Sequence, residues 1–289
     1  MANLVLGLQS HGSCYPCHIC ESRNDSRNGS GWISGKLRTL GSIRDNYHAW
    51  KETANSKLSL AKNFKNCVNL PMFDNSDDTL VLTLVPPAEL HLLLGAVNHL
   101  YSHLRERWGS NEEGEYFADL WAKKGNVIRE KLPYYAFNGN SCRTLLSGFC
   151  LELLRTSVPN EPCYHEYVDA FRKLDKVVTS CFGRNLDPNY EKYISEFRAS
   201  FLFLGIPITP KLHIIFEHIS QFMKLMKDLG WYPRGLGWYS EQAMESVHKD
   251  FMKIWQGSKY NISPLNPKYD QNLLRAVCHF NSLRVKPKC

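Results

Sequence analysis

The sequence predicts a predominantly helical protein of the α+β class. Most of the chain after residue 86 places apolar side chains three and four residues apart, which is the spacing of a helix with one buried face. Hydrophobic residues make up 43% of the 289 residues, a share typical of soluble globular proteins with one or two domains. No apolar run approaches the roughly 20 residues that span a bilayer, so we expect no membrane partner.

The chain opens with apolar side chains at helical spacing between residues 4 and 8, and Gly12 ends this pattern. The compact segment 14–20, CYPCHIC, predicts a strand or a turn. Residues 23–41 are polar and rich in Ser, Gly and Asn, which predicts a loop.

Helices are expected over most of the remaining chain. Pro86 and Pro87 begin the clearest one, whose apolar stripe runs to Leu104 before Gly109 closes it. Further helical patterns cover residues 115–131, 141–156, 164–181, 190–204, 212–229, 240–255 and 272–282. A Gly-containing link, residues 231–240, separates the last two helices from the block before them.

Ten cysteines are scattered through the chain, and no secretory signal sequence opens it. We therefore expect an intracellular, reducing location, where free thiols and metal sites are commoner than disulfides. The net charge of +7 mildly favours a polyanionic partner, but many proteins with a pI near 8.8 bind no nucleic acid. Charge alone therefore decides no function.

A metal site is predicted by two pairs of residues far apart in the chain. Cys17 and Cys20 form a CxxC pair, and His213 and His218 form an HxxxxH pair. The CxxC spacing lets both thiolates of a tight turn reach one ion, and two imidazoles complete the tetrahedral shell of sulfur and nitrogen that zinc prefers. The alternatives are two buried free cysteines, two ordinary histidines, or a three-thiolate site that includes Cys14.

The five-residue interval between the histidines does not suit an ordinary helix. It places the two side chains about 140° apart around the helix axis. Both can ligate one ion only if one of them stands at the start of the helix or if the backbone bends. Pro210 provides such a start just before His213.

A cluster of carboxylates lies in the segment after the link. Glu241 and Glu245 are one helical turn apart, and His248 shares a face with Glu245. The ordinary explanation is solvation of an exposed helix. The functional alternative is a site for Mg²⁺, which takes carboxylate oxygens in phosphoryl-transfer sites. Spacing alone favours the ordinary explanation.

The order of these features resembles the catalytic region of the V(D)J recombinase's catalytic subunit and of related DDE transposases, including transposon-encoded proteins of invertebrates. The stretches that carry the resemblance are GLQSHGSCYPCHIC, PAELHLLLGAVNHL, FNGNSCRTLL, TPKLHIIFEHISQF and LGWYSEQAMESVHKDF. They extend from the start of the chain to about Phe251.

The resemblance implies a partial RNase H-like fold with a large zinc-binding helical insertion. The implied parts are an RNase H-like remnant (residues 1–22), the helical insertion (23–236), the final RNase H-like helix (237–256) and a helical tail (257–289). It also implies roles for particular residues. Cys17, Cys20, His213 and His218 match the zinc ligands, and Glu245, with Glu241 as the alternate, matches the catalytic Glu.

In that family, two aspartates join the Glu to hold two Mg²⁺ or Mn²⁺ ions, and the resemblance places both aspartates before Met1. Because a two-metal site needs several carboxylates, we expect these 289 residues alone not to cleave DNA. The resulting expectation is a transposon-derived, zinc-stabilised protein of the nucleus. It would bind DNA through basic residues such as Arg38, Arg44, Lys51 and Lys57, and a homodimer is a further possible assembly.

Two alternatives stay open at this point. One is a zinc-stabilised helical protein-interaction module from a domesticated transposase. The other is an intact nuclease that uses Glu241, Glu245 and Asp250, although these carboxylates would all come from one helix.

Overall fold

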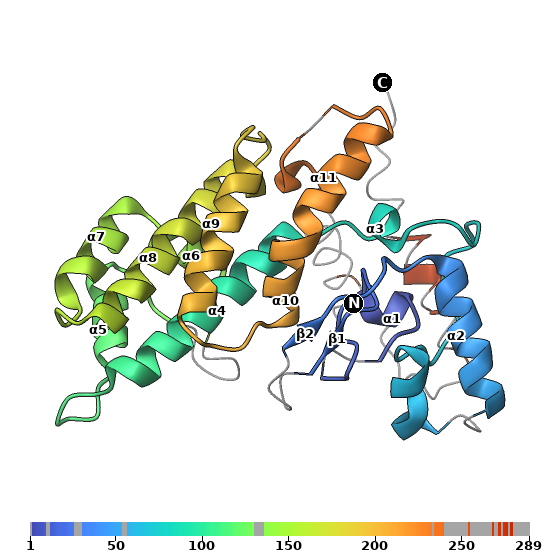
Figure 1. Cartoon of the computed structure of the whole chain (residues 1–289), viewed down its shortest axis with the longest axis horizontal. Coiled ribbons are helices and arrows are strands. Elements are labelled where there is room, and N and C mark those ends of the chain that lie inside the picture. Colours follow the sequence, from blue (N-terminus) through green and yellow to red (C-terminus); the bar gives the residue numbers. More distant parts are fainter. Residues whose placement is uncertain are drawn as a thin grey trace. The chain divides into compact units, whose positions relative to one another are not determined.

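The computed structural model describes residues 2–9, 12–25, 31–53, 57–129, 136–232 and 234–239, together with isolated positions between 254 and 279. The chain divides into two compact units, Met1–Tyr239 and Ser240–Cys289. All the helices and strands named below belong to the first unit (Figure 1).

The N-terminal segment of this unit combines short helices with a minimal sheet. Its elements are α1 (Ala2–Val5), β1 (Arg23–Asn24), β2 (Trp32–Ile33), α2 (Leu40–Thr53), the 3₁₀ segment η2 (Leu58–Phe64) and α3 (Val81–Leu84). β1 and β2 pair antiparallel, with Arg23 opposite Ile33. The segment has a small apolar cluster of its own, made of Leu6, Leu8, Leu40, Ile43, Cys67 and Val81.

A block of helices follows. It consists of α4 (Glu89–Trp108), α5 (Phe117–Lys124), α6 (Gly139–Leu145), α7 (Gly148–Ser157), α8 (Pro162–Val177), the π-helical turn η3 (Val178–Phe182) and α9 (Tyr190–Phe203). α8 packs along α9, and α4 contacts α5, α6 and α8 (Figure 1). Leu93, Val97, Leu100 and Leu104 follow one another along α4 and are all 0% exposed. This stripe places α4 in the main core, as its periodicity predicts.

The last helices of the unit return to the same core. They are α10 (Pro210–His213), the π-helical turn η4 (Ile214–His218), α11 (Ile219–Asp228) and the 3₁₀ turn η5 (Leu236–Trp238). Cys17, Ile19 and Cys20 belong to this main core and not to the N-terminal cluster. The cysteine turn is therefore packed against helices that lie about two hundred residues later in the chain.

The described part of the chain is mostly helical, as the sequence predicts. It shows no RNase H-like sheet, because its strands are limited to β1, β2 and a few isolated bridges. The predicted final RNase H-like helix, residues 237–256, falls almost entirely outside the described residues. The partial RNase H-like fold therefore stays a prediction.

Some helix boundaries differ from the predicted ones for local reasons. Helix α5 ends at Lys124, because Asn126 takes a left-handed φ of 58°. The helix predicted over 141–156 is divided in two, since the Ser147 side chain accepts a hydrogen bond from the Cys150 N–H and starts α7. Helix α2 begins at Leu40, inside the end of the predicted loop.

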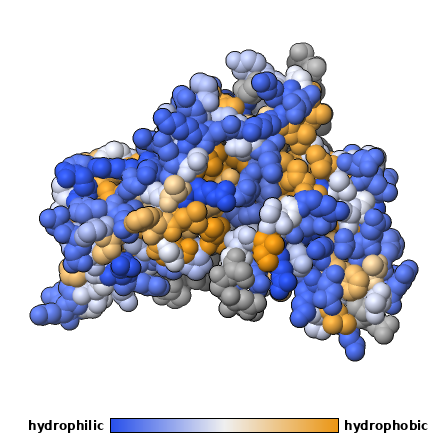
Figure 2. All heavy atoms as spheres, viewed as in Figure 1, coloured by the Kyte–Doolittle hydropathy of each residue, from blue (hydrophilic) through white to orange (hydrophobic). Residues whose placement is uncertain are grey.

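The surface of the described residues is mixed. Hydrophilic side chains cover most of the face shown in Figure 2, and apolar ones gather in patches between them. None of the helices in the described ranges has the length and apolar character needed to cross a membrane.

Candidate metal centre

The cysteine turn presents two buried sulfurs to the helical core. Cys17 and Cys20 are each 1% exposed. The neighbouring segment holds the turn in place, because the Arg38 N–H donates to the Ile19 carbonyl at 2.9 Å and the Glu21 N–H donates to the Lys36 carbonyl at 2.9 Å. Cys20 itself forms an antiparallel bridge with Leu37. The backbone of the turn therefore faces residues 36–38.

The histidines are brought together by a change in helix type. Helix α10 begins at Pro210, where the Thr209 side chain accepts a hydrogen bond from the Leu212 N–H. His213 is the last residue of α10, and the π-helical turn η4 runs from Ile214 to His218. A turn closed by i→i+5 hydrogen bonds contains one more residue than an α-helical turn, so residues five apart come to lie nearly above one another. This widening removes the 140° separation expected for an ordinary helix.

The four predicted ligands form one buried group. Their nearest ligand atoms all lie within 4.8 Å of one another. The His218 Nε2 is 3.4 Å from the Cys17 Sγ and 3.2 Å from the Cys20 Sγ, and the His213 Nε2 is 3.3 Å from the Cys20 Sγ. Both histidines are buried, at 6% exposed for His213 and 2% for His218.

These separations fit a tetrahedral zinc ion. Zinc–sulfur bonds of about 2.3 Å and zinc–nitrogen bonds of about 2.0 Å place tetrahedral neighbours roughly 3.3–3.8 Å apart. The sulfur–nitrogen distances, 3.2–3.4 Å, are slightly shorter than the roughly 3.5 Å expected between a sulfur and a nitrogen on one zinc ion. Two thiolates and two neutral imidazoles are also a donor set of structural zinc sites. The residues present therefore fit the ion in both chemistry and spacing.

The ligands are oriented by further contacts. The His218 Nδ1 lies 2.7 Å from the Gln221 Oε1, so the ring donates to this amide oxygen and leaves the Nε2 lone pair facing the sulfurs. The His213 ring stacks on Trp32 of β2, with the ring centroids 4.0 Å apart and the planes at 6°. The Trp32 Nε1 in turn donates to the Ile208 carbonyl at 2.9 Å. Each imidazole thus has a fixed plane.

The electrostatics of the cysteine pair are asymmetric. The hydrogen bond from Cys17, helped by the two histidines, lowers the pKa of Cys20 far below its ordinary value. Burial raises the pKa of Cys17. The Ser22 Oγ lies 3.1 Å from the Cys20 Sγ. A divalent cation would favour the second thiolate at Cys17 as well, since only the deprotonated sulfur ligates.

The other predicted residues are distributed as follows. Cys14 is partly exposed and is not part of the group of close ligand atoms. Glu241 and Glu245, the predicted catalytic carboxylates, lie outside the described residues, as does Asp250. Lys51 and Lys57 are exposed. Arg44 is engaged with the carbonyls of Asn75 and Phe73 and with the Asp77 carboxylate.

Arg38 is not available to phosphate, contrary to the prediction. Its side chain is 0% exposed and its guanidinium is hydrogen-bonded inside the protein. The sequence places Arg38 in a polar stretch that reads as a surface loop, so nothing in the composition of that stretch signals its burial.

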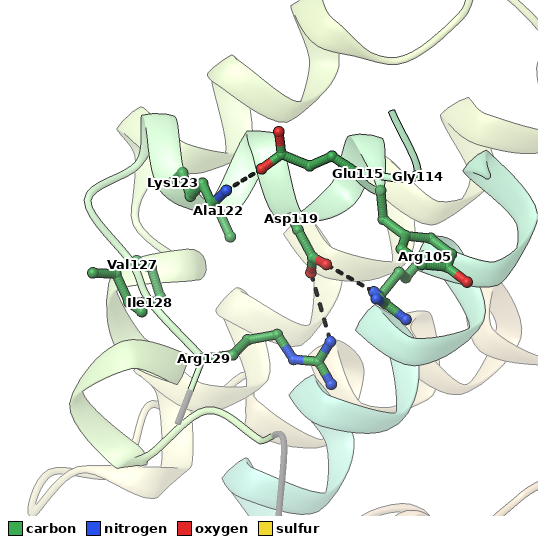
Figure 3. A pocket seen from close by; sticks show the side chains of 10 residues that line it. Arg105, Gly114, Glu115, Asp119, Ala122, Lys123, Val127, Ile128 and Arg129 are labelled. Carbon is green, nitrogen blue, oxygen red and sulfur yellow. Dashed lines mark hydrogen bonds and ion pairs between the residues drawn. The ribbon is translucent and has the colours of Figure 1, made fainter. Parts of the chain in front are cut away.

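A cleft of about 380 Å³ lies beside α4 and α5 (Figure 3). Its central acid, Asp119, accepts a hydrogen bond from the Tyr101 hydroxyl at 2.5 Å and forms ion pairs with Arg105 at 3.0 Å and with Arg129 at 3.6 Å. Burial, and after it the hydrogen bond to Asp119, raises the pKa of Tyr101. The carboxylate is neutralised by its two arginines, so we interpret this network as structural.

The contacts that orient the ligands were not predicted from the sequence. Gln221 follows His218 by three residues, which is a spacing that could have identified it on a helix. Trp32 and Arg38 have no such signal, because they reach the centre only through the folded N-terminal segment. Comparisons with protein-family models and with curated proteins find no match to this chain.

Proposed function

We propose that Cys17, Cys20, His213 and His218 bind one structural Zn²⁺ that fastens the N-terminal segment to the helical block. The observation that carries this proposal is the convergence of four buried ligand atoms from two segments 193–201 residues apart. Zinc sites with four protein ligands are structural, whereas catalytic ones keep a position open for water or substrate. The ion would therefore stabilise the fold and would not act on a substrate.

The test of the zinc site is a metal analysis of the purified protein. We expect about one Zn²⁺ per chain in the wild type and loss of the metal in Cys17→Ser and His218→Ala. Cys142→Ser is the matched control, because Cys142 is likewise buried in the main core but lies outside the ligand group. Wild-type protein that purifies without zinc and does not take it up, or a Cys17→Ser variant that keeps it, would refute the proposal.

We further propose that the chain is part of a DDE-type transposase or of a protein derived from one. The support is the resemblance of the sequence, together with the order in which the cysteine turn, a block of helices and the histidine pair follow one another. On this proposal the protein binds DNA in the nucleus, and these residues alone do not cleave it, because the resemblance assigns them a single catalytic carboxylate, Glu245.

The DNA-binding proposal predicts a particular surface. Lys57 and Lys62 flank or belong to η2, both are exposed, and the described residues give neither a carboxylate partner. Lys192 and Lys224 are also exposed but pair with Glu196 and Glu191. Lysines without a carboxylate partner are the better phosphate contacts, because no ion pair has to be broken.

Duplex binding measured over a range of salt concentrations tests this surface. Replacing Lys57 and Lys62 together by Gln should reduce the slope of log K against log salt by about 2, roughly one per phosphate contact. The Lys192→Gln, Lys224→Gln double variant should change the slope much less. Wild-type protein that binds no duplex at low salt would instead favour the alternative, a zinc-stabilised helical protein-interaction module.

A further inference from the structure

Arg38 occupies an unusual place for a charged side chain. It lies between the N-terminal cluster and the cysteine turn, and its side chain is 0% exposed to solvent. Removing a guanidinium from water costs several kcal/mol unless its donors are satisfied inside the protein. A buried arginine therefore needs hydrogen-bond partners, and the identity of those partners shows what it holds.

The partners of Arg38 include both cysteine residues of the metal centre. Its Nε donates to the Cys20 carbonyl at 3.0 Å and to the Cys17 carbonyl at 3.3 Å. The carbonyls of the turn are thus directed at one donor, while the sulfurs of the same two residues face the histidines. The guanidinium therefore fixes the backbone conformation in which both thiolates point the same way.

The other end of the guanidinium reaches the N-terminal segment. Its Nη2 donates to the Lys65 carbonyl at 3.0 Å, and its Nη1 lies 3.8 Å from the Cys67 Sγ. Cys67 belongs to the N-terminal apolar cluster and forms a bridge with Leu8. The Arg38 side chain thus joins the cysteine turn to the N-terminal cluster.

The backbone of Arg38 makes the same connection. Its N–H donates to the Ile19 carbonyl and its carbonyl accepts from the Val81 N–H, both at 2.9 Å. A lysine could not replace the side-chain contacts of Arg38, because its ammonium cannot present donors in a planar fork to partners on two sides.

We propose that Arg38 is the positioning residue of the metal centre, which holds the cysteine turn in its ligating conformation and couples metal binding to the N-terminal segment. This inference rests on the proposed zinc site. It goes beyond that site, because it assigns the affinity of the centre in part to a residue that touches no metal ion. Residues that orient metal ligands typically contribute about 10–100-fold to metal affinity.

The experiment measures zinc affinity by competition with a chelator of known affinity in the full chain. We expect Arg38→Met to weaken zinc binding about 10–100-fold and Arg38→Lys to give a smaller loss. Arg44→Met is the matched control, because Arg44 also donates to two carbonyls in the N-terminal segment, those of Asn75 and Phe73, but none of its partners carries a ligand. Its zinc affinity should match that of the wild type.

A cobalt spectrum separates positioning from general stability. Co²⁺ in a tetrahedral site of two sulfurs and two nitrogens gives intense visible and sulfur-to-metal absorption, which depends on ligand geometry. We expect an altered or weaker spectrum for Arg38→Lys and an unchanged one for Arg44→Met. If Arg38→Met does not fold, the lysine variant and its spectrum still provide the test.

The outcomes are distinguishable. A wild type that takes up neither zinc nor cobalt refutes the metal centre and the role of Arg38 together. A wild type that binds metal, with Arg38 variants of equal affinity and identical spectra, refutes only the role of Arg38. If the Arg38 variants lose the same amount of thermal stability relative to the wild type with and without zinc, Arg38 is merely structural.

Discussion

The chemistry of single residues depends on how each imidazole and thiol is held. The neutral His218 ring can ligate through its Nε2 only while its Nδ1 carries the proton. The Gln221 Oε1 accepts a hydrogen bond from this Nδ1–H at 2.7 Å. The His213 ring is held by an aromatic neighbour instead of a hydrogen bond, since Trp32 stacks on it with the ring planes at 6°. The two histidines are therefore fixed by different means, one by a hydrogen bond and the other by a flat contact.

Gln221→Leu should weaken zinc binding by about tenfold, because the acceptor that fixes the His218 tautomer is lost. Gln221→Glu should bind zinc at least as well as the wild type, since a carboxylate is a stronger acceptor for the same N–H. Competition with a chelator measures both affinities. Equal affinities in the leucine variant and the wild type would show that the ring is held by packing alone.

The thiols outside the centre should differ in reactivity according to burial. Burial raises the pKa of Cys67 to about 11 and that of Cys142 to about 12. A raised pKa keeps a thiol protonated, so at pH 8 only roughly one Cys67 in a thousand is the reactive thiolate. Alkylation mapped by mass spectrometry should therefore modify the exposed Cys278 and the partly exposed Cys14 and Cys163 before Cys67 and Cys142. Early labelling of Cys67 at pH 8 would contradict this order.

At the scale of the element, the π-helical turn η4 (Ile214–His218) decides the geometry of the histidine pair. It brings His213 and His218 over one another, and it leaves the apolar face of α11 on the core, where Ile219 is 0% and Phe222 is 1% exposed. π-helical turns are rare and are found mostly at functional sites. The wider turn therefore both aligns the two histidines and keeps the apolar face of α11 on the core.

Deleting Glu217 should turn η4 into an α-helical turn and rotate α11 by about 100°. Ile219, Phe222, Met223 and Met226 would leave the core, and each buried apolar side chain contributes about 1.5–3 kcal/mol. The sum is comparable with the whole stability of a domain, so we expect no cooperative thermal transition. Glu217→Ala, which removes only the exposed ion pair with Arg198, should cost no more than about 1 kcal/mol.

The elements differ in how well the sequence predicts them. The stripe of α4 and the start of α10 at Pro210 were predictable, because periodicity and helix-start residues are local signals. The π turn was not, since it depends on the packing of α11 against residues distant in sequence. Helix α2 was not predicted at all, and its first residues, Leu40 and Gly41, close a stretch that is otherwise polar.

At the scale of the whole molecule, the buried group of Cys17, Cys20, His213 and His218 lies where parts with separate apolar clusters meet. Leu6, Leu40, Ile43 and Val81 belong to the N-terminal cluster, whereas Cys17 and Cys20 belong to the main core. The sequence predicted which four residues form the buried group, because their spacing as candidate ligands is visible in the chain. It could not predict that Arg38 is buried behind them, because that contact forms only when both parts are folded.

Chelation should therefore loosen the N-terminal segment before the helical block. We expect a large increase in amide exchange over residues 12–25 and 36–38, and retained protection in α8 and α9, whose contact does not involve the centre. Hydrogen exchange with mass spectrometry, with and without a zinc chelator, measures both. Uniform loss of protection across the chain would show instead that the ion stabilises one indivisible core.

The distance along the chain between the two halves of the centre also has a consequence for synthesis. Cys20 precedes His213 by 193 residues. At a translation rate of about 5–20 residues per second, the cysteine turn leaves the ribosome roughly 10–40 s before its histidine partners exist. During that interval its thiols have neither the imidazoles nor the helical core to cover them. The nascent chain therefore passes through a stage in which both thiols are open to oxidants and to other metal ions before the histidines exist.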